Sequence, residues 1–443
     1  MRLDRRQALS AENFLSFYKS RHHNLQNAPD ISVELKDIKL QFMSFKDLGL
    51  QSALLGKCES LGYFEPTPIQ QKAIPIILEG ADIMACAETG TGKTAAFLLP
   101  IIQGLTENPG NGTRVLILAP TRELANQTEA FCRQFAPKKV RCVSIIGGAG
   151  YRKQADALRS GAHIIVATPG RLMDFMQQGA ISFKHLETLV LDEADRMLDM
   201  GFLPAIKKIV SVIPSERQTL FFSATMSSEI EKIARSIMNE PKVIGISQQG
   251  KPAETIEQTA YPVAAASKTG LLLDLLEREK FERVLVFTRT KRGADRLSHI
   301  LEKRSHSATR IHGNRSQSQR ETALRSFKNG KTRVLVATDV AARGIDVDLV
   351  SHVINYDVPE VPEDYVHRIG RTGRAGNKGR AITLFTAAEE HTMRAIERLT
   401  GQTVERVLLP DFGGSLSVAK NPAPKSASGK KKTFRSFGRR RFR

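Results

Sequence analysis

The chain has few cysteines and no long apolar run, and both shortages exclude classes of protein. Its four cysteines (Cys58, Cys86, Cys132 and Cys142) lie far apart without a Cys-x-x-Cys pair, so neither a zinc site nor a disulfide framework is indicated. No apolar run approaches the roughly 20 residues that span a bilayer, and the N-terminus lacks the apolar segment of a secretory signal. We therefore expect a soluble, cytoplasmic protein with reduced thiols and no membrane partner.

Acidic residues are in short supply relative to basic ones. The 443 residues include 66 Lys and Arg against 46 Asp and Glu, which gives a net charge of +20. Such an excess favours a polyanionic partner, meaning nucleic acid or, less often, an anionic membrane surface. Composition alone also permits a basic surface that only aids solubility.

The C-terminal stretch 411–443 concentrates this positive charge. It contains ten basic residues against the single acid Asp411 and is rich in Gly and Ser. A segment this polar cannot bury a core, so we expect it to be disordered in isolation. Phe434, Phe437 and Phe442 alternate with arginines and could stack on bases. The pattern favours nucleic-acid contact over a purely solubilising or targeting role.

Short apolar runs alternate with longer stretches of helical period, which predicts an α/β fold of parallel sheets covered by helices. The expected strands are 82–86, 115–119, 143–146, 164–167, 189–191 and 219–222 in the first half, and 284–287, 310–311, 334–337, 353–355 and 381–385 in the second. The polar stretch 247–259 between the two series is predicted to be a linker. We expect an N-terminal extension (1–42), two doubly wound domains (43–246 and 260–410) and the basic tail.

A phosphate-binding loop follows the first predicted strand. The segment reads Ala87, Glu88, Thr89, Gly90, Thr91, Gly92, Lys93 and Thr94, and a helical stretch begins after it. Its glycines allow backbone amides to surround phosphate oxygens at a helix N-terminus. We expect Lys93 to reach the β- and γ-phosphates of ATP and Thr94 to help ligate Mg²⁺. Ala87 stands where the consensus has its first glycine, and an accidental match is the alternative.

A second acidic motif follows the strand 189–191. Asp192 and Glu193 come directly after this strand and are followed by Ala194 and Asp195. Beside a phosphate-binding loop, Asp192 is expected to hold Mg²⁺, largely through water, and Glu193 to orient and activate the attacking water. Taken alone, the motif would only indicate a charged strand end that enters a capped helix.

The four residues Asp-Glu-Ala-Asp at 192–195 also give the DEAD-box RNA helicases their name, and the chain resembles this family from Phe45 to about Phe385. The resemblance implies two RecA-like domains with the ATP site between them. Segment 62–70, with Phe45 seventeen positions before Gly62, is similar to the family's Q motif. The compact core and short basic tail most resemble the bacterial RhlE-type branch.

The Q motif supplies the predicted base-binding residues. By resemblance, Gln70 reads the adenine edge, Tyr63 stacks on the adenine face, and Phe45 contributes to the same site. The chemistry is sound because an amide offers both a donor and an acceptor, which can separate adenine from guanine. Without the family, Gln70 would only be a polar residue at the start of a helix.

Two further motifs resemble parts of the family's ATP site that respond to domain closure. Ser223 and Thr225, in a Ser-Ala-Thr segment, are expected to couple the ATP site to closure, and His367 to contact both acidic and Ser-Ala-Thr segments. The residues expected to act from the second domain are Arg371 and Arg374 as arginine fingers, and Gly344 and Asp346 at the ATP ribose. A plain phosphate-backbone patch is the alternative for the arginines.

The remaining motifs resemble the family's RNA contacts. They are hydroxyls, glycine amides and arginines at strand ends, which suit phosphate and sugar contacts that do not read sequence. The predicted residues are Arg122, Gly147, Gly148, Thr168 and Arg171 in the first domain, and Thr288, Arg289, His312, Gly313, Arg320, Thr338 and Arg343 in the second. Each of them alone could belong to loop or capping chemistry.

The resemblance implies an ATP-dependent RNA helicase with ATP and Mg²⁺ as cofactors. RNA and ATP would close the two domains together, because each ligand contacts both. Closure would bend the bound strand, with the helix at 171–178 as a wedge, and separate short duplexes of structured or ribosomal RNA. We expect a monomer. A DNA-directed motor is one alternative, and an ATP-gated RNA clamp or assembly factor is another.

Overall fold

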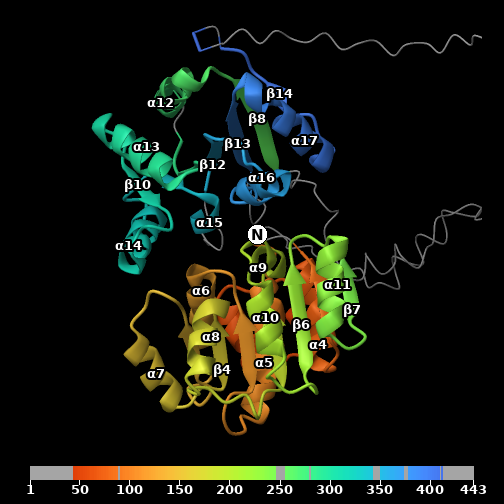
Figure 1. Ribbon diagram of the computed structural model, residues 1–443. Helices are drawn as coiled ribbons and strands as arrows, with labels where there is room; N and C mark the ends of the chain where they lie inside the picture. The colour runs from red at the N-terminus through yellow and green to blue at the C-terminus, as the bar shows by residue number, and fades with distance from the viewer. Residues whose placement is uncertain are drawn as a thin grey trace, which may run out of the picture.

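The computed structural model describes residues 43–87, 90–245, 255–278, 281–342, 350–373, 378–409 and 411–412. They form two α/β domains, one above the other (Figure 1). The predicted N-terminal extension and all but two residues of the predicted basic tail lie outside the described residues. None of the helices in the described ranges has the length and apolarity that a membrane span requires. All four cysteines are free thiols, and three of them are buried.

The first domain contains a seven-stranded sheet in the order β3-β4-β2-β5-β6-β1-β7, with every pair parallel. Its strands are β1 (Ile83–Cys86), β2 (Val115–Leu118), β3 (Cys142–Ile145), β4 (Ile164–Ala167), β5 (Thr188–Leu191), β6 (Gln218–Ser223) and β7 (Lys242–Gly245). Six of them match the predicted strands to within a residue or two. The edge strand β7 was not predicted, because Ile244 is its one buried residue.

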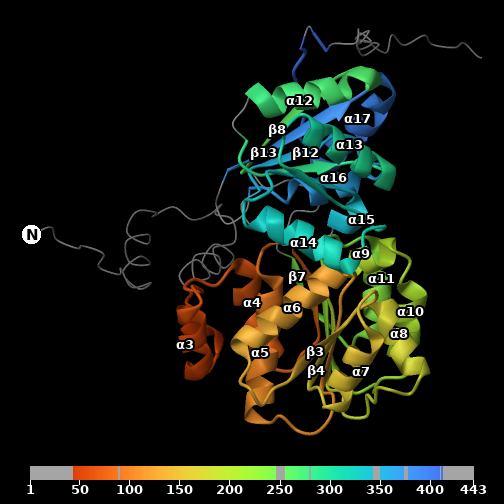
Figure 2. The same ribbon diagram turned by 90° about the vertical axis from the view of Figure 1, so that its left-hand side faces the viewer.

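Helices cover both faces of this sheet, as the doubly wound prediction requires. They are η1 (Phe45–Leu48), α3 (Ser52–Ser60), α4 (Pro68–Leu78), α5 (Lys93–Glu107), α6 (Arg122–Phe135), α7 (Tyr151–Arg159), α8 (Pro169–Gln177), α9 (Ala194–Asp199), α10 (Leu203–Val210) and α11 (Ser228–Ile237). Helices α3 to α6 pack on one face and α7 to α11 on the other (Figure 2). Phe221 and Phe222 enter opposite cores, because successive strand residues alternate between faces.

The second domain repeats this architecture with the strand order β10-β11-β9-β12-β13-β8-β14. Its strands are β8 (Ile256–Pro262), β9 (Val284–Phe287), β10 (Ala308–Ile311), β11 (Val334–Ala337), β12 (His352–Asn355), β13 (Gly379–Phe385) and β14 (Glu405–Arg406). Strands β8 and β14 were not predicted. The predicted linker therefore needs correction, since 256–259 belong to β8, whose polar residues Glu257 and Gln258 hid the strand.

The helices of the second domain are η2 (Ala265–Ser267), α12 (Lys268–Arg278), α13 (Lys291–Lys303), α14 (Gln317–Lys328), α15 (Asp339–Ala342), α16 (Pro362–Ile369), η3 (Ala387–Glu389) and α17 (Glu390–Thr400). The predicted start of the tail also needs correction. Phe412 packs on the second domain's core, and its backbone N–H donates to the Leu409 carbonyl at 3.0 Å. Asp411 and Phe412 therefore belong to the folded domain.

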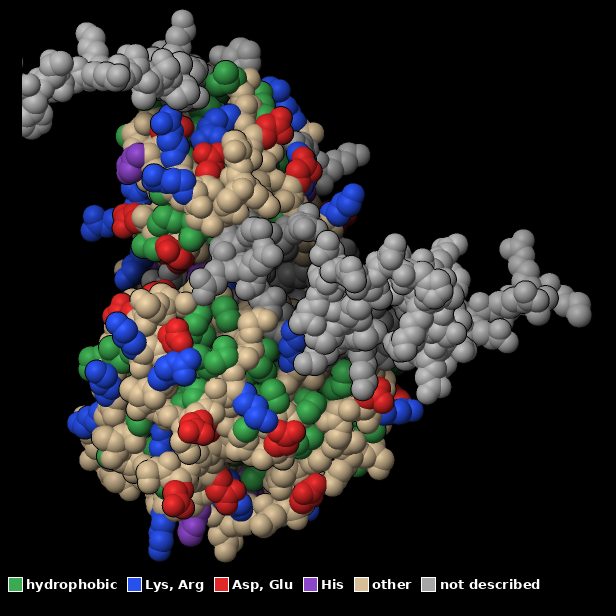
Figure 3. Space-filling model, turned by 90° about the vertical axis from the view of Figure 1, so that its right-hand side faces the viewer, with side chains coloured by type: hydrophobic (Ala, Val, Ile, Leu, Met, Phe, Trp, Pro, Cys, Tyr) green, Lys and Arg blue, Asp and Glu red, His purple; other side chains and the backbone are tan. Residues whose placement is uncertain are grey.

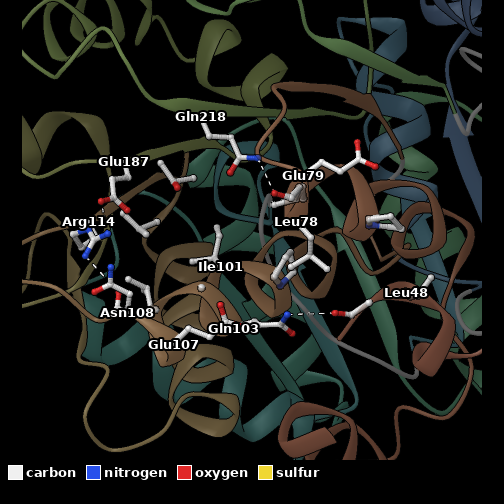
Figure 4. A pocket seen from close by; sticks show the side chains of 18 of the residues that line it. Leu48, Leu78, Glu79, Ile101, Gln103, Glu107, Asn108, Arg114, Glu187 and Gln218 are labelled. Carbon is white, nitrogen blue, oxygen red and sulfur yellow. Dashed lines mark hydrogen bonds and ion pairs between the residues drawn. The ribbon is translucent and has the colours of Figure 1, made fainter. Parts of the chain in front are cut away.

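The two ends of the first sheet differ in what they carry. The carboxyl ends of its strands lead to the predicted motifs and face the second domain, where α9 lies beside α15 and α16 (Figure 1). At the opposite end is a cavity of about 770 Å³, lined by Leu78, Glu107 and Glu187 among others (Figure 4). None of the predicted site residues lines this cavity. The predicted motifs lie at the interdomain edge, where the strands of a parallel sheet end and ligands commonly bind.

On one face of the molecule, the described basic side chains do not form a patch. On the face in Figure 3, Lys and Arg side chains are interspersed with Asp and Glu over both domains. The described side chains on this face therefore form no continuous basic track for a polyanion.

Candidate active site

The phosphate-binding loop joins β1 to α5. Gly90 and Gly92 have φ of 88° and 92°, in the left-handed region that favours glycine. Ala87 instead continues the sheet, and its N–H donates to the Ser223 carbonyl at 2.9 Å. This position needs no glycine, which explains why alanine replaces the consensus residue. Glu88 and Thr89 lie outside the described residues.

The loop is interlocked with the Q motif at Gly92. The Gln70 Nε2 donates to the Gly92 carbonyl at 3.2 Å, and its Oε1 accepts from the Thr67 N–H at 3.0 Å. A Cβ on Gly92 would overlap this amide. Because an amide has two donor protons and two acceptor lone pairs, these bonds leave one of each for a ligand. Adenine recognition by Gln70 is compatible with this placement and stays a prediction.

The two aromatic residues predicted for the base site differ in exposure. Tyr63 is half-buried, and its ring meets Phe131 and Phe135 edge-on, with centroids 6.1 and 5.4 Å apart. Phe45 is buried in the core of the first domain. A core position suits support of the Q motif from beneath, and contact of Phe45 with the nucleotide stays a prediction.

Lys93 and Asp192 form a buried pair with unused polar atoms. Within the described part of the chain, neither the Lys93 Nζ nor the Asp192 Oδ1 has a hydrogen-bond partner. Burial raises the pKa of Asp192 to about 7, although the nearby ammonium of Lys93 opposes the rise. Phosphate oxygens and a divalent cation would satisfy these atoms, so the residues present fit Mg²⁺ and ATP. Thr94 lies half-buried on the first turn of α5.

Glu193 has an unusual backbone and a strongly acidic side chain. It precedes α9 with φ 52° and ψ 53°, a conformation that non-glycine residues keep only when their surroundings enforce it. Burial raises the pKa of Glu193, but Arg196, Lys93 and Arg371 outweigh burial and lower it to about 2. The carboxylate is therefore ionised at neutral pH and can accept a hydrogen bond from a water.

Asp195 ties the acidic motif to the Ser-Ala-Thr segment. Its Oδ2 accepts from the Ala224 N–H at 3.1 Å, the Thr225 N–H at 3.0 Å and the Thr225 hydroxyl at 3.1 Å. The Ser223 hydroxyl donates to the Thr225 carbonyl at 2.6 Å. The coupling role expected of Ser223 and Thr225 stays a prediction. Sequence reasoning assigned no role to Asp195, although it is the last residue of the acidic motif at 192–195.

Arg371 and His367 come to the site from the second domain. Arg371 is buried, and its Nε donates to the His367 carbonyl at 3.3 Å. Its charge is among those that lower the pKa of Glu193, which places it across the domain boundary from this carboxylate. His367 and Arg371 line a narrow crevice together with Arg196 of the first domain. The predicted Arg374, Gly344 and Asp346 lie outside the described residues.

Arg368 is a buried arginine that sequence reasoning missed. Its Nε and Nη2 donate to both oxygens of Asp339 at 2.5 and 2.7 Å, and its Nη1 donates to Asn355 at 3.2 Å. The guanidinium also lies 5.1 Å from the centre of the Phe287 ring. Arg368 thus fixes α16, which carries His367 at its end. An arginine three residues before the predicted finger was the available signal.

The predicted RNA contacts of the first domain lie close together. The Arg122 guanidinium covers Gly148, whose φ is 74°, so closely that a Cβ there would overlap it. Burial, then the charges of Arg320 and Arg171, lower the pKa of Arg122, which places three arginines near one another. Arg171 also lies 5.9 Å from the centre of the Tyr151 ring. The remaining members are Gly147, beside Arg122, and the buried Thr168 at the start of α8.

Several predicted RNA contacts of the second domain have buried side chains, and their contact with RNA stays a prediction. The side chains of Thr288, Thr338 and His312 are buried, and the His312 Nε2 lies 3.0 Å from the Asp295 Oδ1. Packing that the sequence does not display holds these side chains inside the domain. The exposed Gly313 leaves its backbone as the group able to meet a phosphate.

Two arginines predicted to contact RNA have protein partners in this structure. Arg289 is 45% exposed and forms ion pairs with Glu389 at 3.0 Å and Glu360 at 3.6 Å. The Arg320 Nε donates to the Glu123 Oε1 across the domain boundary at 2.8 Å. Figure 2 shows their helices, α14 and α6, side by side. Arg320 therefore makes an interdomain contact, and its contact with RNA stays a prediction. Arg343 lies outside the described residues.

Fold and site together define a class: a two-domain P-loop ATPase whose ATP site is completed by the second domain. The comparisons with known proteins agree. The model of the DEAD/DEAH box helicase family matches residues 67–233, and that of the helicase conserved C-terminal domain matches 267–376. The chain is 44% identical to the DEAD-box ATP-dependent RNA helicase CshA of Geobacillus kaustophilus, over 84% of this chain and 80% of that protein. It is 42% identical to the ATP-dependent RNA helicase vasa of Drosophila melanogaster, over 88% and 60% respectively.

Solved structures show the same arrangement. Dbp5 of S. cerevisiae bound to RNA and ADP BeF3 is similar with a TM-score of 0.76 and 30% identity, over 83% of this chain and 96% of that chain. Mss116p bound to ssRNA and AMP-PNP gives 0.77 and 30%, over 83% and 80%. The chain belongs to the DEAD-box ATP-dependent RNA helicases, and it is an RNA-dependent ATPase. The relatives found do not support the predicted RhlE-type branch.

Proposed function

We propose that Lys93, Thr94 and Asp192 hold the triphosphate of ATP together with Mg²⁺. The observation that carries this proposal is the buried pair of unused atoms, Lys93 Nζ and Asp192 Oδ1. Bound Mg²⁺ would neutralise phosphate charge and polarise the terminal phosphoryl group. Gln70 and Tyr63 bind the adenine base at the side of the loop, where the Gln70 amide already contacts Gly92.

Glu193 and Arg371 act on the reacting atoms. Glu193 accepts a hydrogen bond from the attacking water and orients it toward the γ-phosphorus. Arg371 of the second domain, with Arg374, stabilises the charge that develops on the phosphoryl oxygens. The buried position of Arg371 near Glu193 supports this assignment. Hydrolysis therefore requires the second domain to be docked.

RNA binding stabilises the docked arrangement of the two domains, because the RNA contacts both of them. Arg122 and Arg171 of the first domain and the Gly313 backbone of the second contact phosphates and sugars, so recognition is independent of sequence. The 2′-hydroxyl distinguishes RNA from DNA. An RNA strand that contacts both domains is bent when they close. A bent strand cannot stay paired in a regular duplex, so short duplexes separate. The substrate class is single-stranded RNA and short duplexes in structured RNA, and the protein acts as a monomer.

Steady-state ATP hydrolysis tests this proposal when it is measured without nucleic acid, with single-stranded RNA and with matched single-stranded DNA. We expect strong stimulation by RNA alone. Equal stimulation by DNA would contradict the proposed recognition. An ATP-gated clamp would use the same residues, so duplex separation must be assayed beside the residence time of RNA. A clamp would hold RNA for long times without separating strands.

A further inference from the structure

Arg196 lies between the two domains and has no role in the mechanism so far. It sits on the first turn of α9, three residues after Glu193, and its Nη1 donates to the Glu193 Oε2 at 2.5 Å. The exposed fractions of the two side chains are 3% and 2%. Two opposite charges so well shielded from water interact far more strongly than an exposed pair.

The burial of Arg196 depends on the second domain. Its side chain lines the crevice that also contains His367 and Arg371, and every other lining residue in the described part of the chain belongs to the second domain. These residues are Phe287, Asp339, Ala342, Asp364, His367, Arg368 and Arg371. Withdrawal of the second domain would therefore open the crevice and give Arg196 to water.

The hydrogen bond between Thr225 and Asp195 does not depend on domain closure in this way, because both residues belong to the first domain. The Arg196–Glu193 pair can, because one of its ends is enclosed by the second domain. Glu193 also has the left-handed backbone that its surroundings must enforce. The Arg196 guanidinium, on the first turn of α9, holds the Glu193 carboxylate most firmly while water is excluded.

We propose that Arg196 is a positioning residue that makes the placement of the Glu193 carboxylate depend on domain closure. With the domains docked, the buried ion pair holds Glu193 where it can orient water. With the domains apart, the hydrated pair loosens and Glu193 leaves that position, which suppresses ATP hydrolysis in the absence of RNA. The inference rests on the proposed role of Glu193.

The test compares Arg196→Gln and Arg196→Lys with the wild type. The kcat and KM for RNA-stimulated ATP hydrolysis are measured, together with RNA affinity in the presence of a non-hydrolysable ATP analogue. For Arg196→Gln we expect kcat to fall about a hundredfold, as for the loss of one positioned catalytic group. The KM for ATP and the RNA affinity should stay within about threefold of wild type, since the proposal gives Arg196 no contact with either ligand. Arg196→Lys, which keeps the charge, should recover about tenfold of the loss.

Arg235→Gln is the matched control. Arg235 also pairs with a glutamate on its own helix, Glu231, but is 53% exposed on α11, so its removal should leave all parameters unchanged. An unchanged kcat in Arg196→Gln would overturn the proposal. So would an equal loss of RNA affinity, which would mean that Arg196 merely joins the domains. Circular dichroism would reveal a failure of Arg196→Gln to fold. In that case Arg196→Lys provides the test, and a lower kcat with an unchanged KM would support the proposal.

A double variant separates this inference from the role of Glu193. Glu193→Gln should abolish most turnover, and adding Arg196→Gln should reduce it no further, because both changes remove one function. If Glu193→Gln turns over normally, the proposed role of Glu193 fails. If Glu193→Gln is inactive but the two losses multiply in the double variant, only the proposal for Arg196 fails.

Discussion

Arg320 of α14 donates a hydrogen bond to Glu123 of α6 at 2.8 Å, and this ion pair joins the two domains. Both side chains are largely buried, with exposed fractions of 10% and 7%. The two residues lie 197 positions apart in the chain. Because Glu123 directly follows Arg122 of the proposed RNA surface, the pair links closure to the place where RNA binds.

Replacing Glu123 with Gln should weaken the closed state. The change leaves Arg320 buried without its counter-charge, a loss that costs roughly 3 kcal/mol or more in buried pairs. RNA affinity in the presence of a non-hydrolysable ATP analogue should fall at least tenfold, as measured by fluorescence anisotropy. Arg133→Gln is the control, because Arg133 lies on α6 like Glu123 but its side chain is 72% exposed. Unaltered affinity in Glu123→Gln would show that the pair does not support closure.

Gly92→Ala should abolish ATP binding. The added methyl group would overlap the Gln70 amide, and φ of 92° is strained for alanine. We expect the affinity for a fluorescent ATP analogue to fall at least a hundredfold. Gly104→Ala is a matched control on the same helix, because nothing lies within 4 Å of its added Cβ. The control should keep ATP affinity and raise the melting temperature slightly, since alanine favours helix.

Asp195→Asn should uncouple ATP binding from hydrolysis. An amide in place of the Oδ2 that accepts from Ala224 and Thr225 would bring donors against donors. We expect ATP-analogue affinity within about threefold of wild type and an RNA-stimulated kcat about a hundredfold lower. The exposed Asp156→Asn on α7 is the control. A loss confined to ATP affinity would contradict a coupling role.

Mg²⁺-dependent ATP binding should weaken as the pH falls below neutrality. The pKa of Asp192 is raised to about 7, chiefly by burial, so its carboxyl takes up a proton below that pH. A proton on this group competes with Mg²⁺, and the affinity for a non-hydrolysable ATP analogue should fall about tenfold per pH unit below 7. This slope is measured by titration calorimetry at pH values from about 5.5 to about 8, in steps of about half a unit. In Asp192→Asn the slope should fall to the smaller one that protonation of the nucleotide's terminal phosphate leaves.

The sequence was sufficient to place the central strands and the loops that follow them. Apolar runs such as 334–337 are buried on both faces and match β11 residue for residue. The motifs at their ends were assigned to one edge because parallel strands point the same way. The edge strands β7 and β14 escaped because they bury few residues, and a polar edge resembles a loop.

Residue roles that depend on a distant partner could not be predicted from the sequence. Arg320 is predicted to contact RNA, and only the structure shows that Glu123 lies beside it. His312 is likewise predicted to contact RNA, and only the structure shows that its side chain is buried beside Asp295. Arg368 and Arg371 have the same side chain within one motif, and packing alone separates the structural arginine from the one that faces Glu193.

The contact between Gln70 and Gly92 has a consequence for substitutions at Gln70. The residue expected to choose the base and the loop expected to hold the phosphates share one hydrogen bond and one tightly filled space. A substitution that alters base selection at Gln70 therefore also disturbs the phosphate loop. Base selection and phosphate binding are thus expected to change together when Gln70 is substituted, so that neither property can be altered at this position alone.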